Sequence, residues 1–451
     1  MTENHFVYAH VPYIIKSYQD IVKDPKDTIV FDEELHNQIE RQKEDLGADG
    51  ALLKTPKGDV YHVNMLEKLL ATVLAKISNF VPEAGIWLNT QRPEWNDANN
   101  ALVGNGTSMV TLYYIRRFFT FFDNLIDSVD FSSSLISKEL YDFFSEVSSQ
   151  LTKHETLLGN KIGDHDRQSF VDALGQAGSI YRNQIYNNGF SSKISEISTA
   201  DLKSFIGISI AFIDHSIDAN KRADGLYHAY NLITFEAQGG VSISYLDEML
   251  EGQVAVLSSG YLSPAQADQV LNQMRKSKLY REDQKSYILY PHKDLPRFFE
   301  KNNVPAAAVE SSPLLQALID DDNKQVIQKD CDGAYHFNGN FRNVYSLQAA
   351  ISELPAKYDQ LVSEKDHLFH LFEDLFDHKS FTGRSGTFFA FEGLGSIYWH
   401  MISKLALAAQ EVLWKSIHKE SDTKLIESLK QHYYGIVDGI GAHKTPKAYG
   451  A

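Results

Sequence analysis

A short polar and aromatic segment, residues 92–100, carries the residue types that cleavage of a glycosidic bond needs. The reaction requires a carboxylic acid that stays protonated near neutral pH and reaches the oxygen of the leaving group. A free aspartic acid titrates near about 3.9, so desolvation or a neighbouring carboxylate must favour its protonated form. Trp95 is close enough in sequence to desolvate Asp97, and Glu94 adds like charge. We therefore expect Asp97 to act as a general acid.

The other polar and aromatic residues around Asp97 are candidate sugar contacts. Amide side chains present both a donor and an acceptor, which suits sugar hydroxyl groups. The expected substrate-binding residues are Trp87, Arg92, Glu94, Trp95, Asn96 and Asn100. A second interpretation is structural: Asp and Asn are common helix N-caps, so Asp97 or Asn100 would start the helix that continues toward Ile126.

A resemblance to known enzymes rests on the run Trp95-Asn96-Asp97-Ala98-Asn99-Asn100, which precedes small residues and a long aromatic helix. The run resembles the Trp-Asn-Asp-Gly-x-Asn segment of cellobiose phosphorylase-like enzymes, with Ala98 in place of the family's Gly. Those enzymes are six-hairpin glycosidases with an (α/α)6 barrel. The resemblance implies an uncharacterised branch of that group in which Asp97 is the general acid.

A second carboxylate is expected near the C-terminus, because an inverting mechanism needs a group on the opposite face of the sugar. Glu392 stands beside Gly393, which allows close approach of the backbone, and we expect it to activate water. Trp399 is a further candidate sugar contact, whereas Tyr398 fits an apolar helical row and is expected to pack in the core. The structural interpretation of Glu392 is a first-turn glutamate that interacts with the helix dipole.

Inorganic phosphate would replace water in a phosphorylase, and residues 382–387 have the composition of an anion-binding loop. Small residues, hydroxyl groups and one arginine can hold an anion, although the same residues also form ordinary turns. In the resembled enzymes a histidine contributes to phosphate binding. The candidate phosphate ligands are Arg384, Ser385, Thr387 and His400.

Helical periodicity dominates the chain, so we expect a predominantly α fold with few short strands. The run 109–126 is apolar on nearly every side and must be covered on two faces. Ser263, Pro264 and Gln266 mark a helix start with a capping box. Further helices are expected at 32–46, 64–79, 134–152, 164–187, 199–222, 242–258, 263–276, 358–376, 393–418 and 421–436.

We expect one helical-barrel domain over residues 1–451, an (α/α)6 toroid or part of one. The alternative is that this domain is the C-terminal part of a longer enzyme. Residues from about 277 to 345 lack periodicity and are rich in Pro, Asp and Asn. They predict an irregular excursion between helices, kept ordered by its aromatic side chains.

Charge and cysteine content indicate which binding partners and which cellular compartment to expect. The chain has 43 lysines and arginines against 59 aspartates and glutamates, a formal net charge of −16. This balance disfavours nucleic acid and anionic membranes, whereas a neutral oligosaccharide is not repelled. Cys331 is the only cysteine, and no signal peptide or membrane span is evident. We expect a cytoplasmic protein with no metal and no cofactor, and with phosphate as a possible co-substrate.

Two functions follow from these patterns. The first is a glycoside hydrolase or phosphorylase that inverts the anomeric centre, with Asp97 as acid. The alternative is a non-catalytic carbohydrate-binding or structural helical protein, or an inactive fragment of such an enzyme.

Overall fold

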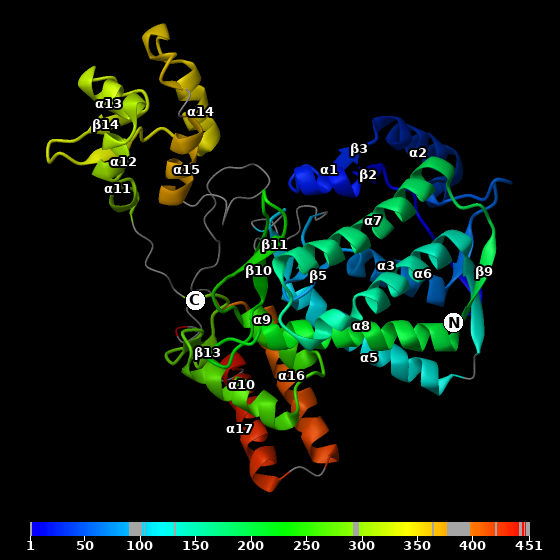
Figure 1. Cartoon of the computed structure of the whole chain (residues 1–451). Coiled ribbons are helices and arrows are strands. Elements are labelled where there is room, and N and C mark those ends of the chain that lie inside the picture. Colours follow the sequence, from blue (N-terminus) through cyan, green and yellow to red (C-terminus); the bar gives the residue numbers. More distant parts are fainter. Residues whose placement is uncertain are drawn as a thin grey trace. The chain divides into compact units, whose positions relative to one another are not determined.

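The computed structural model describes residues 2–89, 102, 104–129, 132–291, 297–362, 365–376, 397–419, 422–441, 444, 445 and 447. The chain is predominantly helical, as the sequence predicted (Figure 1). It divides into two compact units. The first comprises Met1–Gln91, Gly104–Pro291 and Gly393–Ala451, and the second comprises Arg92–Val103 and His292–Glu392.

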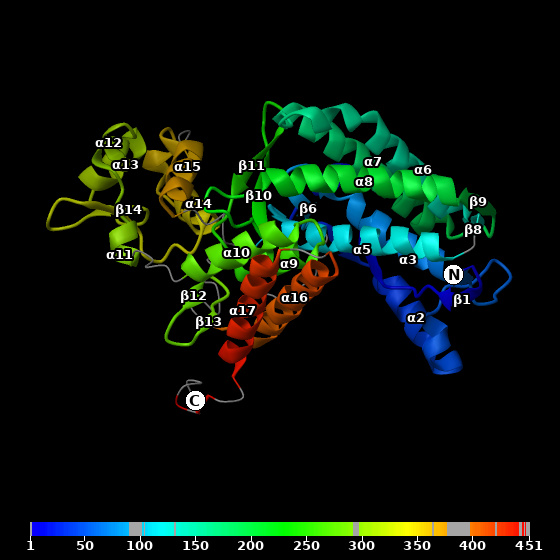
Figure 2. The ribbon, with the colours of Figure 1, turned by 90° about the horizontal axis from the view of Figure 1, so that it is seen from below.

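The first unit contains most of the long helices, and these overlap the predicted ranges; the short helix α1 was not predicted. They are α1 (Tyr18–Lys23), α2 (Glu33–Leu46), α3 (Met65–Ile77), α5 (Met109–Ser128), α6 (Lys138–Lys153), α7 (Asp164–Asn188), α8 (Thr199–Ala219), α9 (Leu250–Ser258), α10 (Pro264–Lys276), α16 (Trp399–His418) and α17 (Thr423–Ile440). Short 3-10 helices span Gly47–Ala51 and Glu155–Gly159. Figures 1 and 2 both show α16 and α17 as neighbouring antiparallel helices.

The apolar helix α5 begins later than the N-cap interpretation of Asp97 and Asn100 required. Its N-cap is Ser108, whose side chain accepts a hydrogen bond from the backbone N–H of Thr111. The interpretation of Asp97 or Asn100 as the cap of this helix is therefore wrong. Helix α5 packs against α8 and α9, which together cover its buried face.

A five-stranded antiparallel sheet in the first unit was not foreseen from the sequence. Its order is β11–β10–β7–β6–β5. The strands are β5 (Phe80–Val81), β6 (Gly85–Trp87), β7 (Gly106–Ser108), β10 (Tyr230–Phe235) and β11 (Val241–Tyr245). Strand β11 occupies the start of the predicted helix 242–258. Val241, Ile243 and Tyr245 alternate with serines, and this period of two fits a strand and not a helix.

The remaining strands of the first unit form two-stranded ribbons. The pairs are β1 (Asn4–Val7) with β4 (His62–Asn64), β2 (Tyr13–Ile15) with β3 (Ile29–Phe31), β8 (Ser133–Ser137) with β9 (Ile194–Ser198), and β12 (Tyr280–Arg281) with β13 (Ser286–Tyr287). Strand β8 replaces the start of the predicted helix 134–152.

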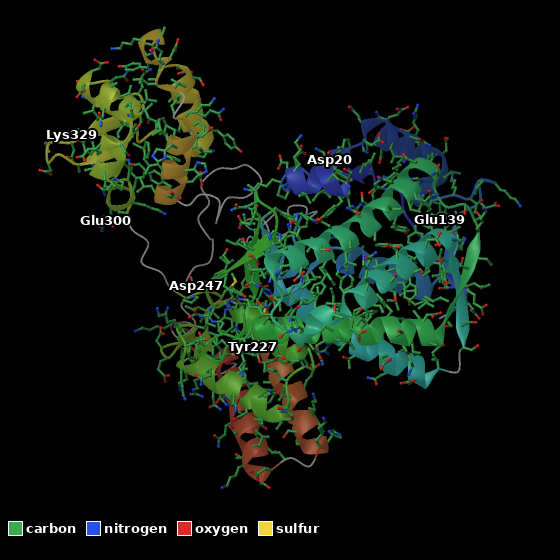
Figure 3. All side chains as sticks on the ribbon, viewed as in Figure 1. Asp20, Glu139, Tyr227, Asp247, Glu300 and Lys329 are labelled. Atoms are coloured by element: carbon green, nitrogen blue, oxygen red, sulfur yellow. The ribbon has the colours of Figure 1, made fainter. Side chains whose placement is uncertain are left out.

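The second unit has its own hydrophobic core. Its described elements are α11 (Phe298–Lys301), α12 (Ala306–Glu310), α13 (Pro313–Asp320), β14 (Ile327–Lys329), β15 (Tyr335–Phe337), α14 (Val344–Ser352), a 3-10 helix (Ala356–Tyr358) and α15 (Lys365–Phe376). Side chains such as Leu315, Phe337 and Phe372 are buried together in it. Figure 3 labels Glu300 and Lys329 in this unit.

The predicted irregular excursion therefore has a different extent and character. Residues 277–291 belong to the first unit, where β12 and β13 pair. Residues 297–345 contain short helices and the hairpin of β14 and β15. Helix α15 occupies the second half of the predicted helix 358–376 and packs in the second core through Leu368, Phe372 and Phe376. The barrel arrangement itself stays a prediction. No helix among the described residues is long and apolar enough to cross a membrane.

Candidate functional site

Three of the residues predicted for the site lie in the described part of the chain: Trp87, Trp399 and His400. The others lie outside the described residues. They are Arg92, Glu94, Trp95, Asn96, Asp97, Asn100, Arg384, Ser385, Thr387 and Glu392.

Both ends of the segment that carries Asp97 are held in the five-stranded sheet. The backbone N–H of Leu88 donates to the Gly106 carbonyl, and the N–H of Gly104 donates to the Leu88 carbonyl, each at 2.9 Å. The N–H of Ile233 donates to the Asn105 carbonyl at 2.8 Å, which ties the returning chain to β10. The chain therefore leaves the sheet after β6 and returns to it before β7, and backbone hydrogen bonds hold both points. We call these two anchored ends, at Leu88 and Gly104, the base of the Asp97 segment.

Trp87 forms part of this base. Its indole N–H donates to the Gly104 carbonyl at 2.8 Å, and its ring lies 5.1 Å from that of Phe235. The side chain is only 3% exposed, so it stabilises the ends of the segment from within the core. This position does not offer the open ring face that a stacked sugar needs.

Trp399 and His400 lie at the beginning of α16. Trp399 is partly buried, and the Lys444 ammonium lies 5.4 Å from the centre of its ring. Partial burial and the nearby Lys404 ammonium lower the pKa of His400, which favours the neutral imidazole at neutral pH. A neutral imidazole has one N–H donor and one acceptor, so it can donate a hydrogen bond to a phosphate oxygen.

The core position predicted for Tyr398 is wrong. Tyr398 is 37% exposed, and its ring packs edge-on against the imidazole of His400, with 3.9 Å between the ring centres. Helix α16 begins at Trp399 with Tyr398 as its N-cap residue, so Tyr398 precedes the apolar row instead of joining it. The same boundary means that Glu392 is not a first-turn residue of α16.

Helices α5 and α9 run in the same direction from a common starting point. The N–H of Met109, the first residue of α5, donates to the Ala229 carbonyl at 2.9 Å. Gly252, in the first turn of α9, approaches Ala229 so closely that a Cβ at position 252 would lie 2.9 Å from the Ala229 Cβ. Near the end of α9, the Ser258 carbonyl accepts from the Arg117 guanidinium at 3.1 Å.

Helix α16 runs parallel to these two helices. Arg117 also binds Glu411 through two hydrogen bonds of 2.6 and 2.8 Å. Four residues further on, the Lys415 ammonium donates to the Leu262 carbonyl at 3.4 Å, beyond the end of α9. The start of α16, with Trp399 and His400, therefore points the same way as the starts of α5 and α9. Helix N-termini carry partial positive charge and favour anions.

Metal ligation has no support in the described part of the chain, where no group of three or more His, Cys, Asp or Glu side chains is arranged to hold an ion.

The second unit is similar to a known module. The family model described as GH149 phosphorylase insertion domain 2 matches residues 295–379. This range corresponds closely to the C-terminal segment of the second unit, His292–Glu392, whose described residues are 297–362 and 365–376. The matched domain and the separate hydrophobic core therefore involve the same part of the chain. No curated protein matches the chain. The similarity to a domain of glycoside phosphorylases is therefore shown for residues 295–379.

Proposed function

We propose that the chain cleaves a glycosidic bond of an oligosaccharide with inorganic phosphate and inversion at the anomeric carbon. The observation that carries the proposal is the match of residues 295–379 to an insertion domain of phosphorylases. It favours phosphate over water as the nucleophile, a choice that the sequence motifs leave open. The fixed base of the Asp97 segment and the N-terminal position of His400 on α16 are consistent with it.

In the proposed reaction the Asp97 carboxyl group donates its proton to the glycosidic oxygen. An oxygen of hydrogen phosphate attacks the anomeric carbon from the opposite face, the carbon–oxygen bond breaks, and the leaving sugar departs as an alcohol. The products are a glycosyl phosphate and the shortened saccharide. The proton that phosphate brings restores the acid form of Asp97.

Phosphate would be held by Arg384, Ser385, Thr387 and His400. Arg384 supplies a planar donor pair that matches phosphate oxygens, and the two hydroxyl groups add donors. Glu392 is then not needed to activate water, and we assign it the role of base only in a hydrolytic reaction. The sugar contacts in this proposal are Arg92, Glu94, Trp95, Asn96, Asn100 and Trp399.

The first test is a screen of oligosaccharides of different sugars and linkages, each incubated with and without inorganic phosphate. Formation of a sugar phosphate that requires phosphate supports phosphorolysis. Release of free sugar alone, at the same rate without phosphate, would assign hydrolysis instead.

The second test is the substitution Asp97→Asn, which keeps the shape of the side chain but removes the proton. We expect the rate on the identified substrate to fall by about two to four orders of magnitude. Asn99→Ala, two residues away, is the control and should retain more activity. Full activity of Asp97→Asn would rule out Asp97 as the acid.

A non-catalytic carbohydrate-binding role is the second candidate. The observation that favours it is that the matched segment covers residues 295–379 and does not include Asp97. Calorimetric titration with the screened oligosaccharides separates the two functions, since binding without turnover, with or without phosphate, would support this role.

A further inference from the structure

A groove of about 570 Å³ lies between helices α6 and α7 of the first unit. Three carboxylates of α6 line it: Glu139, Asp142 and Glu146. They follow one another at intervals of three and four residues, so they share one face of the helix and rise by about 5 Å from one to the next. From α7, Ala177 and Ile180 add apolar surface. The groove therefore combines a row of negative charges with apolar side chains.

Glu139 is the most buried of these carboxylates and is labelled in Figure 3. Its side chain is only 7% exposed. One of its carboxylate oxygens accepts a hydrogen bond from the N–H of Ser191 at 2.9 Å. The other oxygen, Oε2, is buried and has no hydrogen-bond partner among the described residues. Buried carboxylates are normally paired, so Glu139 lacks the partner that its position requires.

A second buried carboxylate, that of Glu67, adds negative charge near Glu139. Glu67 is 3% exposed and accepts from the backbone N–H and the hydroxyl of Ser137, at 2.9 and 2.7 Å. Burial raises the pKa of Glu67, and the negative charge of Glu139 adds to this rise. The neighbouring Lys68 ammonium donates to the Val7 carbonyl at 3.0 Å. Within the described part of the chain, neither Glu67 nor Glu139 forms an ion pair.

The lysines that line the groove do not neutralise Glu139. The Lys138 ammonium binds both carboxylate oxygens of Asp142. Lys193 is exposed, and it forms no ion pair with Glu139. The formal net charge of the chain, −16, favours the approach of a cation from solution. The groove therefore offers an unpaired carboxylate to a cationic ligand.

The chemistry of the groove favours an aliphatic amine over other cations. An ammonium group supplies both the donors and the positive charge that an unpaired carboxylate requires. Methylene segments can lie against Ala177 and Ile180, in the way that lysine stems cover apolar surface. Among the described residues, no group of three or more His, Cys, Asp or Glu side chains is arranged to hold a metal ion. A ligand with several ammonium groups matches the repeated carboxylates of α6.

We propose that the groove between α6 and α7 binds an aliphatic diamine or polyamine, with one ammonium group at Glu139 and a second at Glu146. The terminal torsion of a glutamate side chain is broad, so Glu139 can turn its Oε2 toward the ligand. This site is independent of the proposed glycosidic reaction, and its test needs no glycoside.

The test is calorimetric titration of the full chain at constant ionic strength, with putrescine, with spermidine and with the diol of the same chain length as putrescine. The diol carries hydroxyl donors at the same positions but no charge. We expect saturable binding of putrescine, tighter binding of spermidine, and no binding of the diol, because only the amines neutralise the carboxylates.

Glu139→Gln tests the assigned residue. It keeps the shape of the side chain and an acceptor for the Ser191 N–H, and it removes the charge. We expect the affinity for putrescine to fall by about tenfold or more. Glu34→Gln is the matched control, because Glu34 is an exposed glutamate in the first turn of α2 and does not line the groove. Its affinity should stay within about twofold of the wild type.

Ile180→Arg is a second variant that leaves the core intact, because Ile180 is 68% exposed. It places a guanidinium group in the groove, where it competes with the ligand for the carboxylates. Binding of putrescine should then be lost, whereas the melting temperature should stay close to that of the wild type. Retained affinity in this variant would place the amine elsewhere on the chain and would contradict the proposal.

Three further outcomes would overturn the proposal. Equal affinities of Glu139→Gln, Glu34→Gln and the wild type would show only a general attraction of amines to a negatively charged chain. Binding of the diol as tight as that of putrescine would assign the groove to a neutral hydroxylated ligand. Absence of binding by both amines would show that Glu139 needs no cation from solution.

Discussion

Arg167 shows how a buried charge is accommodated at the level of one residue. It is 2% exposed, and five acceptors surround its guanidinium group. They are the carbonyls of Pro82, Ile162 and Val241 and the carboxylates of Glu83 and Asp164, at 2.6–3.0 Å. One cation thus links the turn between β5 and β6, the start of β11 and the residues around the start of α7.

We predict that Arg167→Met lowers the free energy of unfolding by about 3–5 kcal/mol, because the buried Glu83 carboxylate loses its guanidinium partner and keeps, of its side-chain contacts, the imidazole of His215 at 3.2 Å. Urea unfolding followed by circular dichroism measures the change. Arg281→Met is the control. Arg281 pairs with Asp283 at the surface, where its side chain is 46% exposed, so its loss should change stability by less than about 1 kcal/mol.

His336 in the second unit is held at both ring nitrogens by acceptors. One nitrogen contacts the Asp330 carboxylate at 3.0 Å, and the other contacts the Asn302 carbonyl. Both nitrogens can donate only in the charged imidazolium. The hydrogen bonds to Asp330 and to the Asn302 carbonyl raise the pKa of His336, and the same pair lowers the pKa of Asp330.

This arrangement predicts a pH dependence. Folding raises the pKa of His336, so the protonated side chain stabilises the folded state. This stabilisation is fully present below the pKa of the unfolded chain, about 6.5, and is lost as the pH rises through the pKa of the folded state. Folding lowers the pKa of Asp330, so its carboxylate stabilises the folded state at pH values above about 3.9, the pKa of the unfolded chain. This stabilisation is lost as the pH falls through the pKa of the folded state. The melting temperature of the second unit should therefore fall between neutral and mildly alkaline pH in the wild type. In His336→Gln we expect a flat profile over that range, and a persistent slope would assign it to another group.

At the scale of elements, helix starts were the most predictable feature. The capping box of α10 is present as expected: the Ser263 hydroxyl accepts from the N–H of Gln266 at 3.3 Å, and the Gln266 side chain accepts from the N–H of Ser263 at 2.9 Å. The box could be read from the sequence because all of its partners lie within three residues.

Ser263→Ala should lower the free energy of unfolding of the first unit by about 1 kcal/mol through loss of the cap. Ser263→Asp keeps an acceptor at the same position and should retain most of the stability. Thermal unfolding of the three proteins in parallel provides the measurement, and equal melting temperatures for wild type and Ser263→Ala would show that the cap adds nothing.

The strands were less predictable than the helices. Strands β6 and β7 have three residues each and are paired across a long intervening segment, so no local period marks them. Short strands depend on partners distant in the chain, and sequence patterns do not encode those partners. The hydrogen bonds of the buried Asn231 on β10 could not be predicted for the same reason. Its side chain donates to the Ala84 carbonyl and to the Asn220 side-chain oxygen, and both partners lie in other parts of the fold.

At the scale of the whole molecule, the chain has two units with separate cores. We expect two calorimetric transitions, since each unit buries its own apolar side chains. Phe372→Ala should lower the free energy of unfolding of the second unit only, and Phe170→Ala that of the first unit only, each by about 3–5 kcal/mol. A single transition shifted equally by both substitutions would show that the units unfold together.

The helical class and most helix positions could be predicted from the sequence, because periodicity and caps depend on residues that are close together in the chain. Short motifs also supplied the residues that we propose for chemistry. Three features became apparent only in the folded chain. The buried side chains between Val304 and Phe376 form a separate core, Trp87 supports the base of the Asp97 segment, and α5, α9 and α16 begin on the same side. These features depend on contacts between residues far apart in the chain. The free energy of such contacts comes from burial and pairing that exist only after folding.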